Sequence, residues 1–209
     1  LAKTKSELVE TYLGKIIGED FGKFEALNLA TWSNGLLVYV PKGVVIDKPL
    51  HLLTRAPSSE SFVMRTIVIT EEGSNLTLID EHTGGDENPN THYINAVTET
   101  FAGKASFLRH LMVQNLNKGA NYYLTQRSNT ENDARTLLGI ASFGAKTTKA
   151  NFGTNLAGKG SESTLEGFLL GEKRQHFDHH TIHDHEASNT LSNLNFKVVL
   201  KDRSYSAYT

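Results

Sequence analysis

The stretch from residue 144 to residue 171, G-A-K-T-T-K-A-N-F-G-T-N-L-A-G-K-G-S-E-S-T-L-E-G-F-L-L-G, decides the fold that we predict for this chain. It is rich in Gly, Thr, Asn and Ser, and apolar residues are sparse in it. A two-sheet sandwich needs sustained alternation on both inner faces, whereas flat stacked coils tolerate such a composition better. The stretch therefore favours a β-helix over a sandwich.

The rest of the chain from Gly35 onward consists of short β-prone segments that are separated by glycine-containing turns such as Gly73-Ser74 and Gly84-Gly85. The segments recur about every 10 to 15 residues, a spacing that also fits a sandwich or a barrel. We predict an all-β body of stacked parallel coils over residues 35–209. Its inward-pointing apolar residues should include Leu78, Val97, Leu111, Leu138 and Phe168.

The first 34 residues show helical rather than β periodicity. Between residues 4 and 17 the apolar positions have helical spacing, and Thr4 precedes Glu7 by three residues, as in a capping box. A second short helix is expected between residues 21 and 32, where Phe24, Leu27 and Ala30 recur. Residues 1–34 are thus predicted to be a short helical segment that leads into the β body.

The composition excludes several classes of protein. With 209 residues the chain fits one domain, and without cysteine any metal must sit on His, Asp or Glu. Lys and Arg total 21 against 23 Asp and Glu, with no basic block, so nucleic acid is not an expected partner. No apolar run approaches the roughly 20 residues that span a bilayer, and the N-terminus is not signal-like. We expect a cytoplasmic protein with no membrane partner.

Five of the nine histidines lie within residues 176–185, Q-H-F-D-H-H-T-I-H-D-H being the surrounding sequence from residue 175. If this run is a strand, His179, His183 and His185 share one face with Phe177 and Thr181. Imidazole is a common metal ligand and binds only when neutral, so these three histidines are candidate ligands of a labile, pH-sensitive divalent-metal site. A polar strand whose histidines are satisfied by protein partners explains the run more simply.

Other motifs in the chain give weaker evidence for a functional site. The run from His183 to Glu186 has the wrong spacing for a cupin site, and residues 158–163 lack the last glycine of a dinucleotide fingerprint. Asp178, Asp184 or Glu186 could serve as acid and base in a polysaccharide-cleaving β-helix enzyme, a lyase or a hydrolase. Such an enzyme is the alternative function, although a single tryptophan and the lack of an export signal disfavour it.

The C-terminal stretch over residues 183–204, H-D-H-E-A-S-N-T-L-S-N-L-N-F-K-V-V-L-K-D-R-S, resembles the SufB/SufD family of iron–sulfur cluster assembly scaffold proteins. The likeness continues upstream in F-E-A-L-N at residues 24–28, W-S-N-G at 32–35 and V-Y-V-P-K-G-V at 38–44, and it spans residues 12–209. Residues 169–171, followed by H-F-D-H-H at 176–180, look more like the SufD branch than the SufB branch.

The resemblance implies a right-handed parallel β-helix that works as a non-enzymatic scaffold with a SufB-like subunit and a SufC-like ATPase. A homodimer is also compatible with it. No firmly bound cofactor is expected, only transient iron or a nascent iron–sulfur cluster at the level of the complex. The chain starts without Met and stops in an alternating pattern at Thr209, so we expect a fragment truncated at the C-terminal end of its β-helix. The family's cluster-site segment is not in this sequence, and no catalytic residue is carried over.

Overall fold

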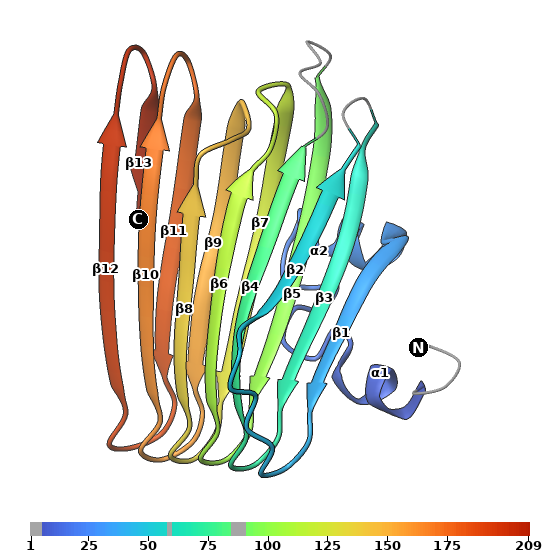
Figure 1. Cartoon of the computed structure of the whole chain (residues 1–209), viewed down its shortest axis with the longest axis vertical. Helices are drawn as coiled ribbons and strands as arrows, with labels where there is room; N and C mark the ends of the chain where they lie inside the picture. The colour runs from blue at the N-terminus through green and yellow to red at the C-terminus, as the bar shows by residue number, and fades with distance from the viewer. Residues whose placement is uncertain (1–5, 58–59, 85–90) are drawn as a thin grey trace.

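The structure is a computed structural model of the chain and describes residues 6–57, 60–84 and 91–209 (Figure 1). In these residues two short helices precede a series of parallel strands. The helices are α1 (Ser6–Tyr12) and α2 (Lys23–Thr31), and the strands are β1 (Asn34–Val40), β2 (Leu50–Ala56), β3 (Phe62–Thr70), β4 (Asn75–Gly84), β5 (His92–Ala102), β6 (Phe107–Asn115), β7 (Ala120–Thr130), β8 (Arg135–Ser142), β9 (Thr147–Leu156), β10 (Glu162–Gly171), β11 (His176–His185), β12 (Leu191–Leu200) and β13 (Tyr205–Tyr208).

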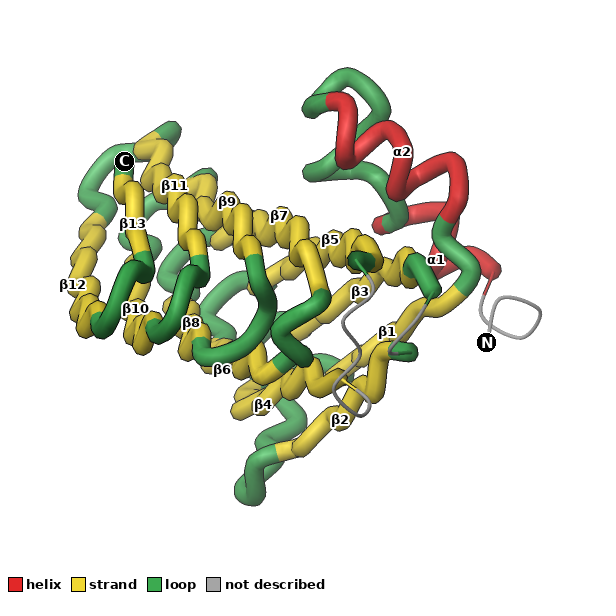
Figure 2. Tube along the Cα trace, turned by 90° about the horizontal axis from the view of Figure 1, so that it is seen from above, coloured by secondary structure: helices red, strands yellow, loops and turns green. Residues whose placement is uncertain are grey.

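The strands form a parallel β-helix, as the sequence predicted. Odd-numbered strands make one sheet, here called sheet A, and even-numbered strands make a second sheet, sheet B. Successive strands therefore alternate between the sheets, and two strands with their turns complete one coil (Figure 2). Phe177 pairs with Ser206, about 29 residues later, so the 10-to-15-residue spacing in the sequence corresponds to half a coil.

The interior is filled by alternate residues of each strand. In β4 and β6 buried and half-buried side chains alternate along the whole strand, as expected when one face looks inward. Leu76, Leu78, Leu108 and Leu138 are fully buried there. Burying one such side chain contributes about 1.5–3 kcal/mol, so this stacked interior is the main source of stability.

Of the five residues predicted to point inward, Leu78 and Leu138 do so. The prediction is wrong for Val97, Leu111 and Phe168, which lie on the outer faces because each is one position out of step with the inward residues of its strand. Val97 is nevertheless buried, because the N-terminal segment covers the outer face of its strand.

The coils turn at two corners, visible at the lower and upper ends of the strands in Figure 1. The lower corner is formed by turns that lead from sheet A to sheet B, and the upper corner by turns that lead from sheet B to sheet A. Stacked turns at the lower corner approach each other so closely that a Cβ on Gly158 would lie 1.9 Å from the backbone nitrogen of Asn132. Left-handed residues recur at the same corner, for example Gly73 and Gly160.

The N-terminal segment lies on the outer face of sheet A (Figure 2). The side chain of Asn28 in α2 donates to the backbone carbonyls of Met64 (2.9 Å) and Asn95 (3.2 Å), and Phe24 stacks on Tyr123 with ring centroids 4.3 Å apart. Residues 21–32 form the predicted second helix, whereas the first helix ends at Tyr12 rather than at residue 17. The capping box predicted at Thr4 lies outside the described residues.

A buried ion pair fastens this segment to the sheet. The carboxylate of Glu99, on the outer face of β5, accepts the backbone N–H groups of Gly14 (2.9 Å), Ile16 (2.8 Å) and Ile17 (3.0 Å). Arg65 on β3 donates to the same carboxylate from Nη2 at 2.9 Å and to the carbonyl of Ile17. Both charged side chains are almost completely buried, at 1% and 0% exposure. This buried ion pair therefore holds the segment together with the Asn28 hydrogen bonds and the Phe24–Tyr123 stack.

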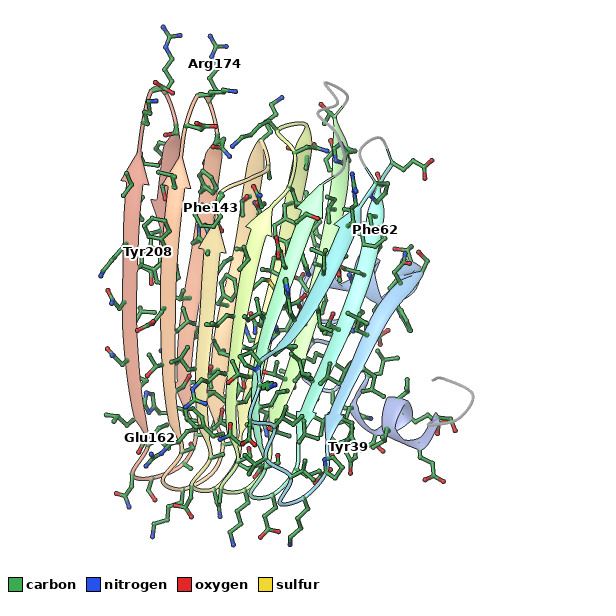
Figure 3. All side chains as sticks on the ribbon, viewed as in Figure 1. Tyr39, Phe62, Phe143, Glu162, Arg174 and Tyr208 are labelled. Carbon is green, nitrogen blue, oxygen red and sulfur yellow. The ribbon has the colours of Figure 1, made fainter. Side chains whose placement is uncertain are left out.

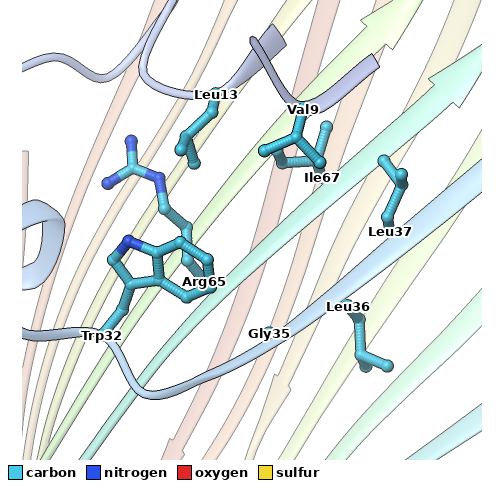
Figure 4. Close-up of a pocket in the computed structure, with 8 residues that line it drawn as sticks. All are labelled: Val9, Leu13, Trp32, Gly35, Leu36, Leu37, Arg65 and Ile67. Carbon is cyan, nitrogen blue, oxygen red and sulfur yellow. The ribbon is translucent and has the colours of Figure 1, made fainter. Parts of the chain in front are cut away.

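An apolar cavity of about 300 Å³ remains between the N-terminal segment and strands β1 and β3 (Figure 4). Val9, Leu13 and Trp32 line it from the side of the segment. Trp32 can lie across β1 because Gly35 has no side chain, since a Cβ there would approach its ring to 3.1 Å.

Candidate functional site

A cluster of polar side chains is enclosed in the β-helix, and its members come from three strands. Asp80 and His82 project inward from β4, His110 from β6, and Tyr122 and Gln126 from β7 on the opposite sheet. None of the five side chains is exposed by more than about 1%. Two sheets that face each other across the interior therefore bring residues 46 positions apart in sequence into one site.

Asp80 is the centre of this cluster. Its two carboxylate oxygens lie 3.2 Å from Nε2 of His82 and 3.5 Å from Nε2 of His110. On their other sides, Nδ1 of His82 lies 2.7 Å from the Tyr122 hydroxyl and Nδ1 of His110 lies 3.0 Å from the Gln126 amide nitrogen. An amide nitrogen can only donate, so Nδ1 of His110 accepts and its proton is on Nε2, facing Asp80.

The contacts fix the charges in the cluster. Burial raises the pKa of Asp80, but the contacts with His110 and His82 outweigh it and hold that pKa well below its usual range. Burial raises the pKa of Tyr122 well above its ordinary value, so its hydroxyl stays protonated. The cluster thus combines a buried, ionised carboxylate with two imidazoles in direct contact.

A row of hydroxyl groups runs beside the cluster along the interior of sheet A. Thr100, Ser128 and Thr154 stand at paired positions on β5, β7 and β9, and His183 on β11 continues the row. Thr154 accepts a hydrogen bond of 3.1 Å from Ser163, whereas the Ser128 hydroxyl has no partner in the described part of the chain. Polar side chains therefore extend from the cluster toward the histidine-rich strand.

The predicted metal ligands His179, His183 and His185 do share the inward face of β11. His179 is buried, stacks on Phe177 and packs against the tilted ring of Phe196, with Nε2 3.5 Å from the Ser142 hydroxyl. The two ring nitrogens of His185 contact Thr190 at 2.6 Å and Ser192 at 3.0 Å. Nδ1 of the buried His179 and Nε2 of the half-buried His183 have no hydrogen-bond partner in the described residues.

No group of three His, Asp or Glu side chains within residues 6–57, 60–84 and 91–209 is placed to hold one metal ion. Burial lowers the pKa of His179 to about 4, and burial together with the neighbouring His185 lowers the pKa of His183. Both rings are therefore neutral at pH 7, which is the form that ligates metals. The metal site at these histidines stays a prediction.

The three carboxylates of the alternative enzyme lie outside the interior. Asp178 points outward and forms an ion pair of 3.1 Å with Lys149. Asp184 is exposed six residues further along the same strand, about 20 Å away at the usual rise per residue, and Glu186 lies in the following turn. A glycosidase needs two carboxyl groups within roughly 5–9.5 Å, so Asp178 and Asp184 do not form such a pair.

The sequence contains a signal for the buried cluster. Leu76, Leu78, Asp80 and His82 occupy alternate positions, so the two polar residues continue the inward face that the two leucines begin. Polar residues at core positions of a strand are exceptional and need partners. The prediction was placed instead on the histidine run at residues 176–185, where five histidines lie close together in the sequence.

Because His179 is neutral in the folded protein, we expect the folded protein to lose stability as the pH falls. His179 takes up a proton near pH 6.5 in the unfolded chain and only near pH 4 in the folded protein. Its contribution to the free energy of unfolding is therefore complete above pH 6.5 and is lost as the pH falls. The expected loss at pH 5 is about 2 kcal/mol in the free energy of unfolding. Urea unfolding at pH 7 and pH 5 tests this.

In that experiment His179→Phe should show a smaller loss than the wild type, whereas a change of the exposed neighbour, His180→Asn, should leave the loss unchanged. An equal fall in stability for His179→Phe and the wild type would contradict the assignment of this effect to His179.

Two comparisons with known proteins bear on the whole chain. The family model for the SufBD core domain, described as SUF system FeS cluster assembly, matches residues 52–209, and the model for the SufBD N-terminal region matches residues 1–52. The chain is 28% identical over 200 residues to the iron–sulfur cluster assembly protein SufB of Bacillus subtilis, covering 95% of this chain and 43% of the relative. It is 26% identical over 201 residues to an iron–sulfur cluster assembly SufBD family protein of Staphylococcus saprophyticus, covering 96% and 43%.

The chain thus spans less than half the length of these curated relatives. None of the helices that the structure describes is both long and apolar enough to cross a lipid bilayer.

Proposed function

Because the chain belongs to the SufBD family of iron–sulfur cluster assembly proteins, we propose that it acts as a non-enzymatic scaffold subunit that pairs with a SufB-like subunit and a SufC-like ATPase. The observation that carries the proposal is that the core-domain match coincides with the β-helix, from β2 to β13. The N-terminal match covers the segment that is clamped to sheet A. The whole described architecture, rather than one motif, is therefore the family's.

Strands β12 and β13 are each paired on one side only in the described residues. The inward-facing side chains of β12 include Leu194, Val198 and Leu200, which are 44%, 43% and 44% exposed. A further coil of a longer chain completes such an edge as well as a strand of another chain does. The proposed pairing with a SufB-like subunit therefore rests on the family match and not on this edge.

In this proposal iron or a nascent cluster is cargo of the assembled complex and contacts this subunit only transiently. His183 is the residue of the predicted trio that best fits a ligand role, because its Nε2 has no hydrogen-bond partner in the described chain and the residue is half-buried, whereas His179 is buried. The SufD-like position within the complex rests on residues 169–171 and 176–180, which resemble that branch.

Co-expression with a SufB-like subunit and a SufC-like ATPase tests the pairing. We expect the chain to co-elute with the SufB-like subunit in size-exclusion chromatography. A wild-type chain that never co-elutes with such a partner would refute the proposal.

A further inference from the structure

Four turns at the upper corner of the β-helix carry an excess of positive charge. These turns, which follow β6, β8, β10 and β12 and are fully described, contain six basic residues against the two carboxylates of Glu172 and Asp202. The six are Lys118, Lys146, Lys173, Arg174, Lys201 and Arg203. The whole chain, in contrast, has a formal net charge of -2. Positive charge is therefore concentrated on one edge of an otherwise slightly acidic molecule.

Most of these cations have no carboxylate partner among the residues that the structure describes. Lys118 forms an ion pair of 3.4 Å with Glu172 and donates to the carbonyl of Phe143. Asp202 accepts the backbone N–H of Lys173 at 2.9 Å. The remaining five side chains are exposed, and none of them has an ion pair with another described residue. Their charge is thus available to a partner.

The coil repeat arranges these charges in a column. Arg174 and Arg203 stand at equivalent places, each two residues before the paired positions His176 and Tyr205. Neighbouring strands of a sheet lie about 4.8 Å apart, so four stacked turns extend over about 15 Å. Figure 3 shows Arg174 projecting away from the strand ends at this corner.

One of the cations occupies a backbone position that does not favour it. Lys173 has a φ of 56°, in the left-handed region that suits glycine and costs energy for a residue with a Cβ. Non-glycine residues take left-handed positions in other turns too, Ala145 and Asp202 at the upper corner and Ala105, Asp133 and Asn189 at the lower corner. The left-handed position is therefore a recurring feature of the turns, and at Lys173 it carries a cation.

We propose that the upper corner is a docking surface for an acidic polypeptide segment that presents three or four carboxylates within about 15 Å. A short acidic segment fits better than nucleic acid for two reasons. Glu172 and Asp202 within the column would repel a continuous phosphate backbone, and the net charge of -2 repels a long polyanion. Local attraction survives, because screening at physiological salt acts beyond about 8 Å. This surface goes beyond the proposed scaffold function and does not depend on it.

The test measures binding of a fluorescein-labelled octaglutamate peptide to the purified chain by fluorescence anisotropy, at low salt and at about 0.3 M salt. Affinity should fall as salt rises. The variant Lys146→Glu/Arg174→Glu/Arg203→Glu should lose about tenfold or more in affinity, since three attractive contacts become repulsive. The matched control is Lys48→Glu/Lys104→Glu/Lys159→Glu, which changes the net charge equally on exposed residues near the lower corner and should lose less than about threefold.

A single substitution separates binding from folding. Lys173→Gly removes one cation and relieves the left-handed strain, so it should raise the melting temperature while weakening peptide binding about twofold or more. Equal losses in the two triple variants, or no binding by the wild type, would overturn the proposal. Tighter binding of a single-stranded oligonucleotide than of the peptide would overturn it in favour of a nucleic-acid surface.

Discussion

Replacing Glu99 with glutamine is expected to lower the free energy of unfolding by about 3–5 kcal/mol, because the change leaves the buried guanidinium of Arg65 without a counter-charge. The substitution keeps the shape of the side chain but removes the charge that holds three backbone N–H groups of the N-terminal segment. Urea unfolding measures the loss. Hydrogen exchange should show the amides of Gly14, Ile16 and Ile17 becoming less protected than those of the β-helix.

The matched control for this prediction is Glu81→Gln, which removes the carboxylate of an exposed pair with His51 and should change stability by about 0–1 kcal/mol. A double variant, Arg65→Met/Glu99→Leu, should recover a large part of the stability, because it removes both buried charges together. If Glu99→Gln were as stable as Glu81→Gln, the ion pair would not be what fastens the segment.

Replacing Asp80 with leucine should also strongly destabilise the protein. Leucine has nearly the same shape, but it removes the carboxylate that lies 3.2 Å from Nε2 of His82 and 3.5 Å from Nε2 of His110. Losing a charged partner beside a buried polar group costs about 1–3 kcal/mol, so the expected loss for the two contacts is about 2–6 kcal/mol. Urea unfolding at pH 7 measures it. Asp178→Leu, which removes an exposed ion pair with Lys149, is the control and should stay within about 1 kcal/mol of the wild type.

Nitrogen NMR of the histidine side chains provides an independent check on the cluster. In the wild type the ring proton of His110 should reside on Nε2, because the Gln126 amide donates to its Nδ1. In Asp80→Leu the preference should weaken, since Nε2 loses its carboxylate. A wild-type His110 protonated on Nδ1, together with an unchanged stability of Asp80→Leu, would contradict the proposed arrangement of the cluster.

The residues of the buried cluster do not form a motif along the chain. His82 and His110 are 28 residues apart and Tyr122 lies on the opposite sheet, so no local pattern connects them. The dense run around His179 was conspicuous by contrast. The structure divides that run between an interior face and an exposed face, and it gives His185 two hydroxyl partners.

The sequence by itself determined the class of fold. Sparse apolar residues among Gly, Thr, Asn and Ser over residues 144–171 indicated stacked coils, and the motif over residues 183–204 indicated the family. Strand alternation placed Leu78 and Leu138 inside, because period 2 is a local property of an extended chain. The same local pattern assigned Leu111 and Phe168 wrongly, because a shift of one residue exchanges the two faces of a strand.

Only the tertiary structure decided which polar groups meet. The contact of Asp80 with His110, the capture of the N-terminal backbone by Glu99 and the column of cations at the upper corner all join residues that are far apart in the sequence. These contacts depend on the coil length of about 29 residues and on the register between neighbouring strands, which many long-range pairings set together. Their physical origin is cooperative packing across coils, so no single segment of the sequence specifies them.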